Sequence, residues 1–228
     1  MNFYNNLHGV IFDFNGTLFF DTPKHEQAWR EYAMQLCGRK VSEEEFSRCI
    51  HGRTNAEILK YFVGEGISDD EISRHSEDKE ALYRELCLAD KESFHLANGA
   101  EEFLDELKSR GVPMAIATSS GKTNSDFYME KFCLNRWFDE TTFVYNDGSF
   151  RSKPHPDIYL HAAEVIGIEP SDCTIFEDMP SGIQSAKAAG AGRIIAVASA
   201  LSREFLAGFE GVDAVIGDYT EVNNIKHI

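Results

Sequence analysis

The stretch VIFDFNGTLF, from Val10 to Phe19, joins a short apolar run to a polar turn. The apolar run belongs to HGVIFDF, residues 8–14, which predicts a buried strand because it is short and closes on a turn that contains glycine. Asp13 stands at the end of this strand, and Asn15 follows two residues later. The stretch therefore places a carboxylate at a strand end, and an amide where a second carboxylate would complete an acid/base pair.

The second half of the chain alternates between strand and helix patterns. Short apolar runs predict strands at residues 112–120, 140–147, 173–179, 193–199 and 213–218. Helical patterns fill the intervals between these runs. Nearly continuous apolar strands that alternate with helices are typical of a parallel sheet covered on both faces. The sequence therefore predicts an α/β fold with a Rossmann-like parallel sheet as its core.

A different pattern, without a convincing strand, follows the first strand. Apolar residues at helical spacing predict helices at about residues 22–37, 42–50, 55–66 and 68–90. Ser42 is followed by three acidic residues, which is a typical start of a helix. We therefore expect an α-helical bundle of residues 22–96, inserted after strand one into a core of residues 1–21 and 97–228.

Composition limits the partners of the chain. Its 228 residues include 38 acidic and 22 basic ones, so the formal net charge is −16. Long-range repulsion argues against nucleic acid or an anionic membrane as the main partner, but a small phosphorylated substrate can still be held by local donors and a metal. No apolar run approaches the roughly 18 residues of a bilayer-spanning helix, and the N-terminus lacks a secretory signal pattern. We expect a cytoplasmic protein without an obligate protein partner.

Polar side chains follow the predicted strands at their carboxyl ends. In a parallel sheet these ends meet at one edge, where ligands bind. The polar residues at that edge are Asp13, Asn15, Thr17, Thr118, Ser119, Ser120, Asp147, Lys153, Glu177 and Asp178. A carboxylate can attack phosphorus, further carboxylates can hold Mg²⁺, and a lysine and a hydroxyl can bind the remaining phosphoryl oxygens. The set favours phosphoryl transfer.

Each of these residues also has a plainer interpretation. Asp13 could cap its own turn, and Thr118 could begin a helix. Lys153 and the pair Glu177-Asp178 could be solvated loop residues. Because all of them fall at one end of one sheet, the combined pattern favours a site.

Four segments together resemble the haloacid-dehalogenase-like hydrolases, most closely the branch that contains β-phosphoglucomutase and small sugar-phosphate phosphatases. DFNGTL resembles the first motif of that family, usually written DxDGT, and IATSS resembles the second. SKPHPDIY resembles the third motif, and FEDMPSGIQSAKAAG is very close to the fourth. The motifs occur in the family's order, and the helical insertion is similar to the cap of that branch. The resemblance covers nearly the whole chain.

The resemblance implies roles for residues at the sheet edge. Asp13 would be the nucleophile, and Thr118 would bind the phosphoryl group with help from Lys153. The ligands of Mg²⁺ would be Asp13, Glu177, Asp178 and the main-chain carbonyl of Asn15. Two further candidate substrate contacts, next to Thr118, are Ser119 and Ser120.

The resemblance also makes residues 22–96 a cap that selects the substrate. His25 falls where the branch keeps a histidine near the hinge, although a helix-surface histidine is the plainer interpretation. HGRTN, residues 51–55, falls on the cap segment that meets the substrate, although it could be a solvated turn. His51 and Asn55 stand where the mutase pattern has a lysine and an arginine, and Arg53 is displaced from that pattern. This difference argues against mutase specificity.

Asn15 departs from the family's first motif, which has a second aspartate as general acid and base. Such catalysis is typically worth about 10²–10⁴-fold, and an amide cannot transfer the proton. We therefore expect a Mg²⁺-dependent phosphatase for a small phosphorylated metabolite, either a sugar phosphate or an activated phosphate, with weakened acid/base catalysis. The alternatives are a β-phosphoglucomutase-like phosphohexose mutase and a catalytically impaired protein that binds a phosphorylated ligand.

Overall fold

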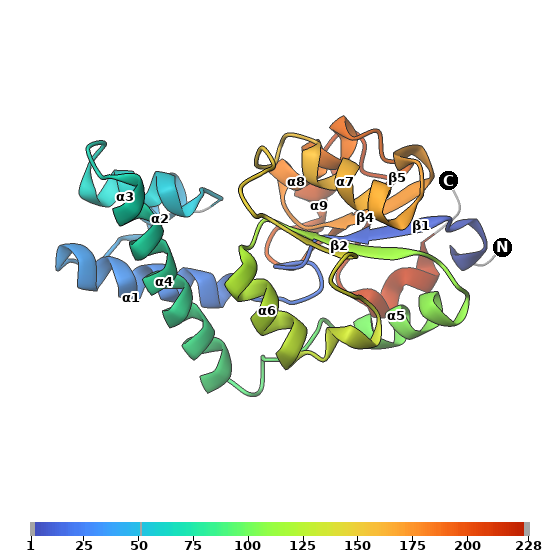
Figure 1. Ribbon diagram of the computed structural model, residues 1–228, viewed down its shortest axis with the longest axis horizontal. Helices are drawn as coiled ribbons and strands as arrows, with labels where there is room; N and C mark the ends of the chain where they lie inside the picture. The colour runs from blue at the N-terminus through green and yellow to red at the C-terminus, as the bar shows by residue number, and fades with distance from the viewer. Residues whose placement is uncertain (1–2, 51, 226–228) are drawn as a thin grey trace. The chain divides into compact units, whose positions relative to one another are not determined.

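The computed structural model describes residues 3–50 and 52–225 (Figure 1). Within these ranges it contains one parallel sheet of six strands in the order β3-β2-β1-β4-β5-β6. The strands are β1 (Gly9–Phe12), β2 (Met114–Thr118), β3 (Phe143–Tyr145), β4 (Cys173–Glu177), β5 (Arg193–Val197) and β6 (Ala214–Ile216). In the register of the sheet, Ile11 of β1 lies opposite Ala115 of β2 and Ile175 of β4. The strand that ends at the DFNGT turn is therefore central and fully buried.

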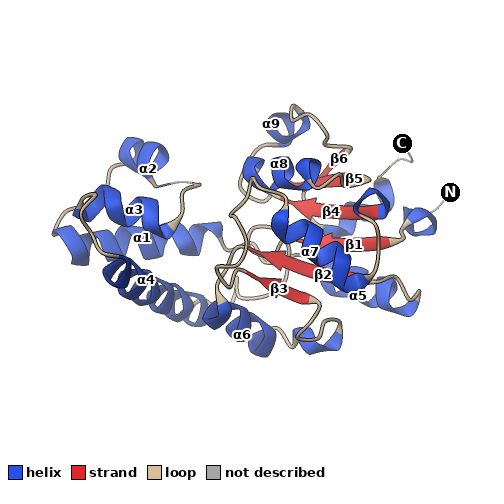
Figure 2. Ribbon diagram, turned by 45° about the horizontal axis from the view of Figure 1, so that its top comes forward, coloured by secondary structure: helices blue, strands red, loops and turns tan. Residues whose placement is uncertain are grey.

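Helices cover both faces of the sheet (Figure 2). They are α5 (Ala100–Ser109), α6 (Lys122–Lys131), α7 (Asp157–Ile166), α8 (Pro180–Ala188) and α9 (Arg203–Ala207), with 3-10 turns η1 (Phe3–Asn6), η2 (Leu134–Arg136), η3 (Pro170–Asp172) and η4 (Tyr219–Asn224). On one face Ile11 shares a buried cluster with Tyr159 of α7 and Ile183 of α8. On the other face the ring of Phe12 lies 6.0 Å from that of Phe103 in α5. Successive strand residues thus enter opposite layers, and the predicted α/β fold class is confirmed.

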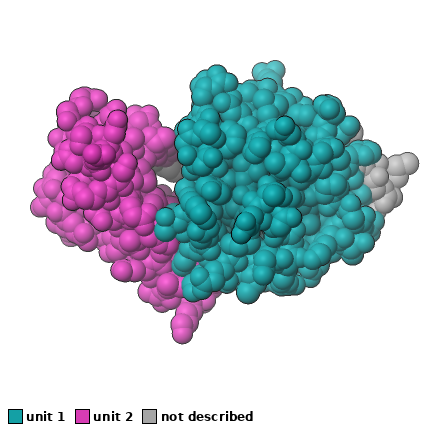
Figure 3. Space-filling model, viewed as in Figure 1, with its two compact units in different colours: residues 1–20, 95–228 teal, residues 21–94 magenta. Residues whose placement is uncertain are grey.

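The chain forms two compact units, residues 1–20 with 95–228 and residues 21–94 (Figure 3). The second unit contains α1 (Thr22–Cys37), α2 (Glu43–Cys49), α3 (Asn55–Val63) and α4 (Asp69–Ala89). Its buried core includes Trp29, Phe46 and Leu59. Hydroxyl side chains cap three of the four helices, namely Ser42, Thr54 and Ser68. These caps satisfy backbone donors that a helix start leaves without partners, which explains why each helix begins where it does.

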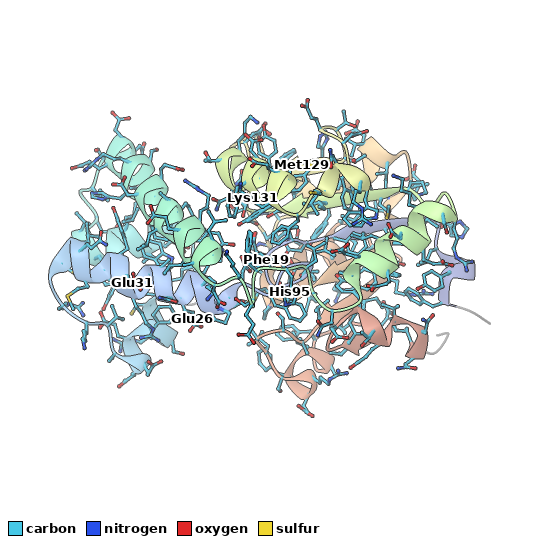
Figure 4. All side chains as sticks on the ribbon, turned by 90° about the horizontal axis from the view of Figure 1, so that it is seen from below. Phe19, Glu26, Glu31, His95, Met129 and Lys131 are labelled. Atoms are coloured by element: carbon cyan, nitrogen blue, oxygen red, sulfur yellow. The ribbon has the colours of Figure 1, made fainter. Side chains whose placement is uncertain are left out.

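The exposed positions on the helices of the second unit include polar residues as well as the large apolar residues Met34, Tyr61, Val63 and Leu88. On α1 the amide of Gln27 donates to the carboxylate of Glu31 over 2.8 Å, one turn apart (Figure 4 labels Glu26 and Glu31 on this helix). In residues 3–50 and 52–225, no helix has the length and apolar content that crossing a membrane requires.

Candidate active site at the carboxyl edge of the sheet

The turn after β1 brings a buried carboxylate to the carboxyl edge. The backbone N–H of Asp13 still donates to the carbonyl of Phe176 in β4, over 3.0 Å. The chain then reverses at Gly16, which has a φ of 77° and donates its N–H to the carbonyl of Phe19 over 2.7 Å. A Cβ on Gly16 would lie 2.1 Å from Oδ2 of Asp178. Glycine is therefore needed here both for its backbone conformation and for the close approach of the carboxylate.

Aromatic rings that pack against Phe14 and Phe19 hold this turn in place. Phe14 stacks on Tyr128 of α6 with ring centroids 4.5 Å apart. The ring centroid of Phe19, which is labelled in Figure 4, lies 4.8 Å from that of Phe132 at the end of the same helix. Both phenylalanines are fully or almost fully buried. The residues between them, including Asn15, are consequently held in one conformation by the core.

Three carboxylates meet at this edge. Asp13, Glu177 and Asp178 are buried, and each offers an oxygen within 4.8 Å of the others. Lys153, from the loop before α7, forms ion pairs with Asp13 at 2.7 Å and with Glu177 at 2.8 Å. Burial would lower the pKa of Lys153, but the charges of Asp13 and Glu177 outweigh it and hold the pKa well above its ordinary value. Lys153 is therefore a permanent cation in this cluster.

Glu177 is held through both of its oxygens. Oε1 accepts from Lys153 and, over 3.2 Å, from the hydroxyl of the buried Tyr159. Oε2 accepts from the backbone N–H of Met179 over 2.7 Å. Gly182 in α8 packs so closely that a Cβ there would lie 1.6 Å from Oε1. The side chain has no freedom to leave the cluster.

The side chain of Asn15 lies among three hydroxyl groups. Its Oδ1 accepts from Ser120 over 2.8 Å and from Thr118 over 3.3 Å. Its Nδ2 donates to the hydroxyl of Tyr128 over 2.9 Å. Asp178, on the other side of the turn, accepts from Thr17 over 3.2 Å. Residues that follow β1, β2 and β4 in the sequence are thus brought together in space.

Two further residues expected at this edge lie apart from the cluster. Ser119 is exposed and lines a shallow hollow that also includes Lys153. Asp147 is exposed as well, and its carboxylate accepts from the N–H and the hydroxyl of Ser149 over 2.9 and 2.5 Å. Asp147 therefore ties its own turn and does not join the carboxylates of β1 and β4.

In the second unit, His25 belongs to a hydrogen-bonded cluster. Its ring stacks on Tyr83 at 3.9 Å, its Nε2 lies 3.3 Å from Asp21, and its Nδ1 lies 3.2 Å from the ammonium of Lys79. An ammonium has only donors, so Nδ1 accepts and Nε2 carries the proton that faces Asp21. His25 is thus held in one orientation by residues of α1 and α4.

The other expected cap residues have separate positions. Arg53 is exposed and donates to the carbonyl of Arg48 over 3.2 Å. Asn55 donates to Glu80 over 2.9 Å, so the start of α3 is tied to α4. His51 lies outside the described residues.

Lys79 and Glu80 are polar residues of this unit that sequence reasoning missed. Lys79 is 1% exposed and forms an ion pair with Glu80 at 2.6 Å. Burial would raise the pKa of Glu80, but the charge of Lys79 and the hydrogen bond from Asn55 lower it to about 2. A signal was present in the sequence, because Lys79 precedes the buried Tyr83 by one helical turn and Cys87 by two.

The sequence of this chain matches the model of a known protein family. The model of the haloacid dehalogenase-like hydrolases matches residues 7–190. The chain belongs to this family. Hexitol phosphatase A of Escherichia coli (strain K12) is 31% identical over 189 residues, which cover 83% of this chain and 82% of that protein. A phosphorylated carbohydrates phosphatase of Thermotoga maritima is 30% identical over 200 residues, 86% of this chain and 88% of that protein.

A solved structure extends the likeness. The crystal structure of a family IA, variant 3 haloacid dehalogenase hydrolase from Entamoeba histolytica has a TM-score of 0.89 and 39% identity. The match covers 94% of this chain and 95% of that one. The family resemblance expected from the four motifs is confirmed, and the haloacid dehalogenase-like chain is an enzyme of the phosphoryl-transfer hydrolase class.

Proposed function

We propose that this haloacid dehalogenase-like hydrolase is a Mg²⁺-dependent phosphatase that acts on a small phosphorylated metabolite through a phosphorylated Asp13. The observation that carries the proposal is the cluster of three buried carboxylates around Lys153. Family membership and the named phosphatases among its relatives support a sugar-phosphate-like substrate.

The residues present fit a divalent cation. Three carboxylates with oxygens within 4.8 Å of one another form an oxygen-rich donor set of the kind that Mg²⁺ takes. Glycines at positions 16 and 182 leave room for the carboxylates where any Cβ would collide with them. Asp13, Glu177 and Asp178 would hold the ion, with the main-chain carbonyl of Asn15 as a further ligand. When bound, the ion neutralises charge on phosphoryl oxygens.

Asp13 would act as the nucleophile. A carboxylate oxygen forms a bond to phosphorus while the bond between phosphorus and the leaving oxygen breaks, and the leaving group keeps the electron pair. The nearby charge of Lys153 favours the ionised form of Asp13, which is the reactive one. Lys153 and the hydroxyl of Thr118 would hold the phosphoryl oxygens. Water then attacks the phosphorus, the bond to the Asp13 oxygen breaks, and inorganic phosphate leaves with the protons of water, which restores the carboxylate.

Asn15 sets which substrates the site can use. Its amide hydrogen-bonds to Ser120 and Tyr128, but it can neither protonate a leaving oxygen nor take a proton from water. The carboxylate of an acyl phosphate and the phosphate of a phosphoanhydride leave without protonation, whereas a sugar alkoxide needs it. We therefore expect slow turnover of sugar phosphates, and faster turnover of activated phosphates.

The inserted helical unit would select among substrates as a cap. His25, Arg53 and Asn55 are candidate contacts on it, as are Ser119 and Ser120 on the core. The polar cluster around Lys79 holds His25 and Asn55 in defined positions, which supports a recognition role for both side chains.

A phosphatase screen tests the proposal. Purified protein is assayed with Mg²⁺ on hexose and hexitol monophosphates and on acetyl phosphate, beside Asp13→Asn and a sample treated with chelator. We expect release of phosphate that needs both the metal and Asp13. Full activity of Asp13→Asn would remove Asp13 as the nucleophile.

The same samples separate the alternatives. Conversion of β-glucose 1-phosphate to glucose 6-phosphate without release of phosphate would favour a mutase. Binding of a sugar phosphate with no turnover of any substrate would favour a ligand-binding protein.

A further inference from the structure

Tyr219 carries a hydroxyl that the fold buries without a partner. The residue is 2% exposed, and among residues 3–50 and 52–225 no group forms a hydrogen bond with its hydroxyl oxygen. Burying an unpaired hydroxyl is unfavourable, and a phenylalanine would avoid that cost. A polar group in such a place calls for a ligand or a water molecule that completes its bonding.

The position of Tyr219 relates it to the carboxylates. It opens η4, three residues after β6, so its backbone starts from the carboxyl edge of the sheet. Its ring lies 6.1 Å from Phe12 and 5.5 Å from Phe176. These are the residues directly before Asp13 and the pair Glu177-Asp178. The ring therefore packs beneath the two strand ends that supply the carboxylates.

The two acids at the end of β4 have different partners. Glu177, the last residue of the strand, is held on both oxygens by Lys153, Tyr159 and the backbone of Met179. Asp178 follows the strand, where its carboxylate accepts from Thr17 in the turn after β1 and offers an oxygen within 4.8 Å of one from Asp13. Burial raises the pKa of Tyr219 well above its ordinary value, and the charges of Asp13 and Asp178 raise it further. The hydroxyl is therefore protonated and lies within the field of these two carboxylates.

We propose that the Tyr219 hydroxyl is a donor to the cation site of Asp13 and Asp178, where it hydrogen-bonds to the hydration shell of the ion. The inference rests on the proposed function, because it requires a hydrated cation at these carboxylates. Mg²⁺ usually keeps several of its water molecules in proteins, which provides acceptors for a buried donor. Tyr219 is thus a positioning residue for the metal, and it lies in a segment that none of the four motifs includes.

The test compares metal-free stability with metal affinity in the full chain. Tyr219→Phe removes the hydroxyl and keeps the ring. Thermal unfolding is measured after chelation and then in a titration with Mg²⁺ alone. We expect Tyr219→Phe to melt at the same or a higher temperature than the wild type without metal, because it loses only an unpaired group. We expect its Mg²⁺ affinity to fall by about 10-fold, at the lower end of losses for groups that orient a metal site from outside the ligand shell.

Two controls make the outcome specific. Tyr4→Phe changes a ring 5.8 Å from Phe103 in the same aromatic cluster, but its hydroxyl lies in the field of Glu106 and Arg110. It should leave Mg²⁺ affinity unchanged. Asp178→Asn should abolish Mg²⁺ binding if the proposed cation site exists.

The possible results separate the two proposals. If wild type binds Mg²⁺, Asp178→Asn does not, and Tyr219→Phe binds as wild type does, the role of Tyr219 is wrong while the metal site stands. If wild type itself binds no Mg²⁺, the proposed function loses its metal and the inference is overturned with it. A lower melting temperature of metal-free Tyr219→Phe would show that the hydroxyl already has a partner, which also overturns the inference.

Discussion

Replacing Asn15 by aspartate restores the acid/base group that this chain lacks. In the structure, the amide lies against the hydroxyls of Ser120, Thr118 and Tyr128 at 2.8, 3.3 and 2.9 Å. Each hydroxyl can turn to donate to a carboxylate, so the variant keeps its contacts and should fold. The perturbation therefore adds a transferable proton with little change of shape.

The same hydroxyls determine the size of the gain. Donors to an ionised carboxylate lower its pKa, so a smaller fraction of the carboxyl group carries the proton that the leaving group needs. We therefore expect Asn15→Asp to raise kcat/KM on a sugar monophosphate by about 10²-fold, at the lower end of the acid/base range. On acetyl phosphate, whose leaving group departs as a carboxylate, the gain should stay below about 10-fold.

Steady-state release of phosphate from a hexitol monophosphate and from acetyl phosphate measures both gains under one condition. Asn15→Ala is the matched control, because it removes the hydrogen bonds without adding an acid, and it should gain on neither substrate. Equal gains of Asn15→Asp on the two substrates would refute the argument from leaving groups.

Two further predictions concern the two compact units. Gly182→Ala places a Cβ where Oε1 of Glu177 now lies. We therefore expect its Mg²⁺ affinity to fall by at least about 10-fold in a thermal-shift titration. Gly121→Ala, at an exposed glycine with open space around it, should leave the Mg²⁺ affinity unchanged. The pKa of Glu80 is lowered from 4.5 to about 2, so its stabilising effect is complete above pH 4.5 and is lost as the pH falls toward 2. Unfolding by urea across this range should show the loss, and Glu80→Gln should flatten it; an unchanged pH profile would contradict the role of the Lys79–Glu80 pair.

The fold was predictable because the apolar residue pattern of its strands differs from the patterns of the segments around them. The central run before Asp13 is apolar at every position, as a strand covered on both faces requires. The helical insertion was recognisable from periodicity and from hydroxyl caps such as Ser42. What the insertion does for substrate selection remains a prediction, since recognition depends on side chains whose positions spacing does not give.

The site was only partly predictable. Asp13, Lys153 and the Glu177-Asp178 pair were expected at one edge because parallel strands end there. Tyr128 was not expected as a partner of Asn15, because a tyrosine at helical spacing resembles any core residue until the neighbouring turn is placed against it. The burial of Lys79 was not expected either, because a lysine within a run of charged residues usually faces solvent.

The central claim is that Asp13 carries the phosphoryl group during turnover, and the most direct measurement is mass spectrometry of protein quenched in acid during reaction with acetyl phosphate and Mg²⁺. Without a general base at position 15, attack of water on the acyl phosphate is slow, so the phosphorylated form should accumulate. The account predicts one added phosphoryl group on the peptide that contains Asp13, absent from Asp13→Asn and reduced in Asn15→Asp. Turnover of acetyl phosphate with no phosphoryl group on that peptide, or with the group on another residue, would contradict it.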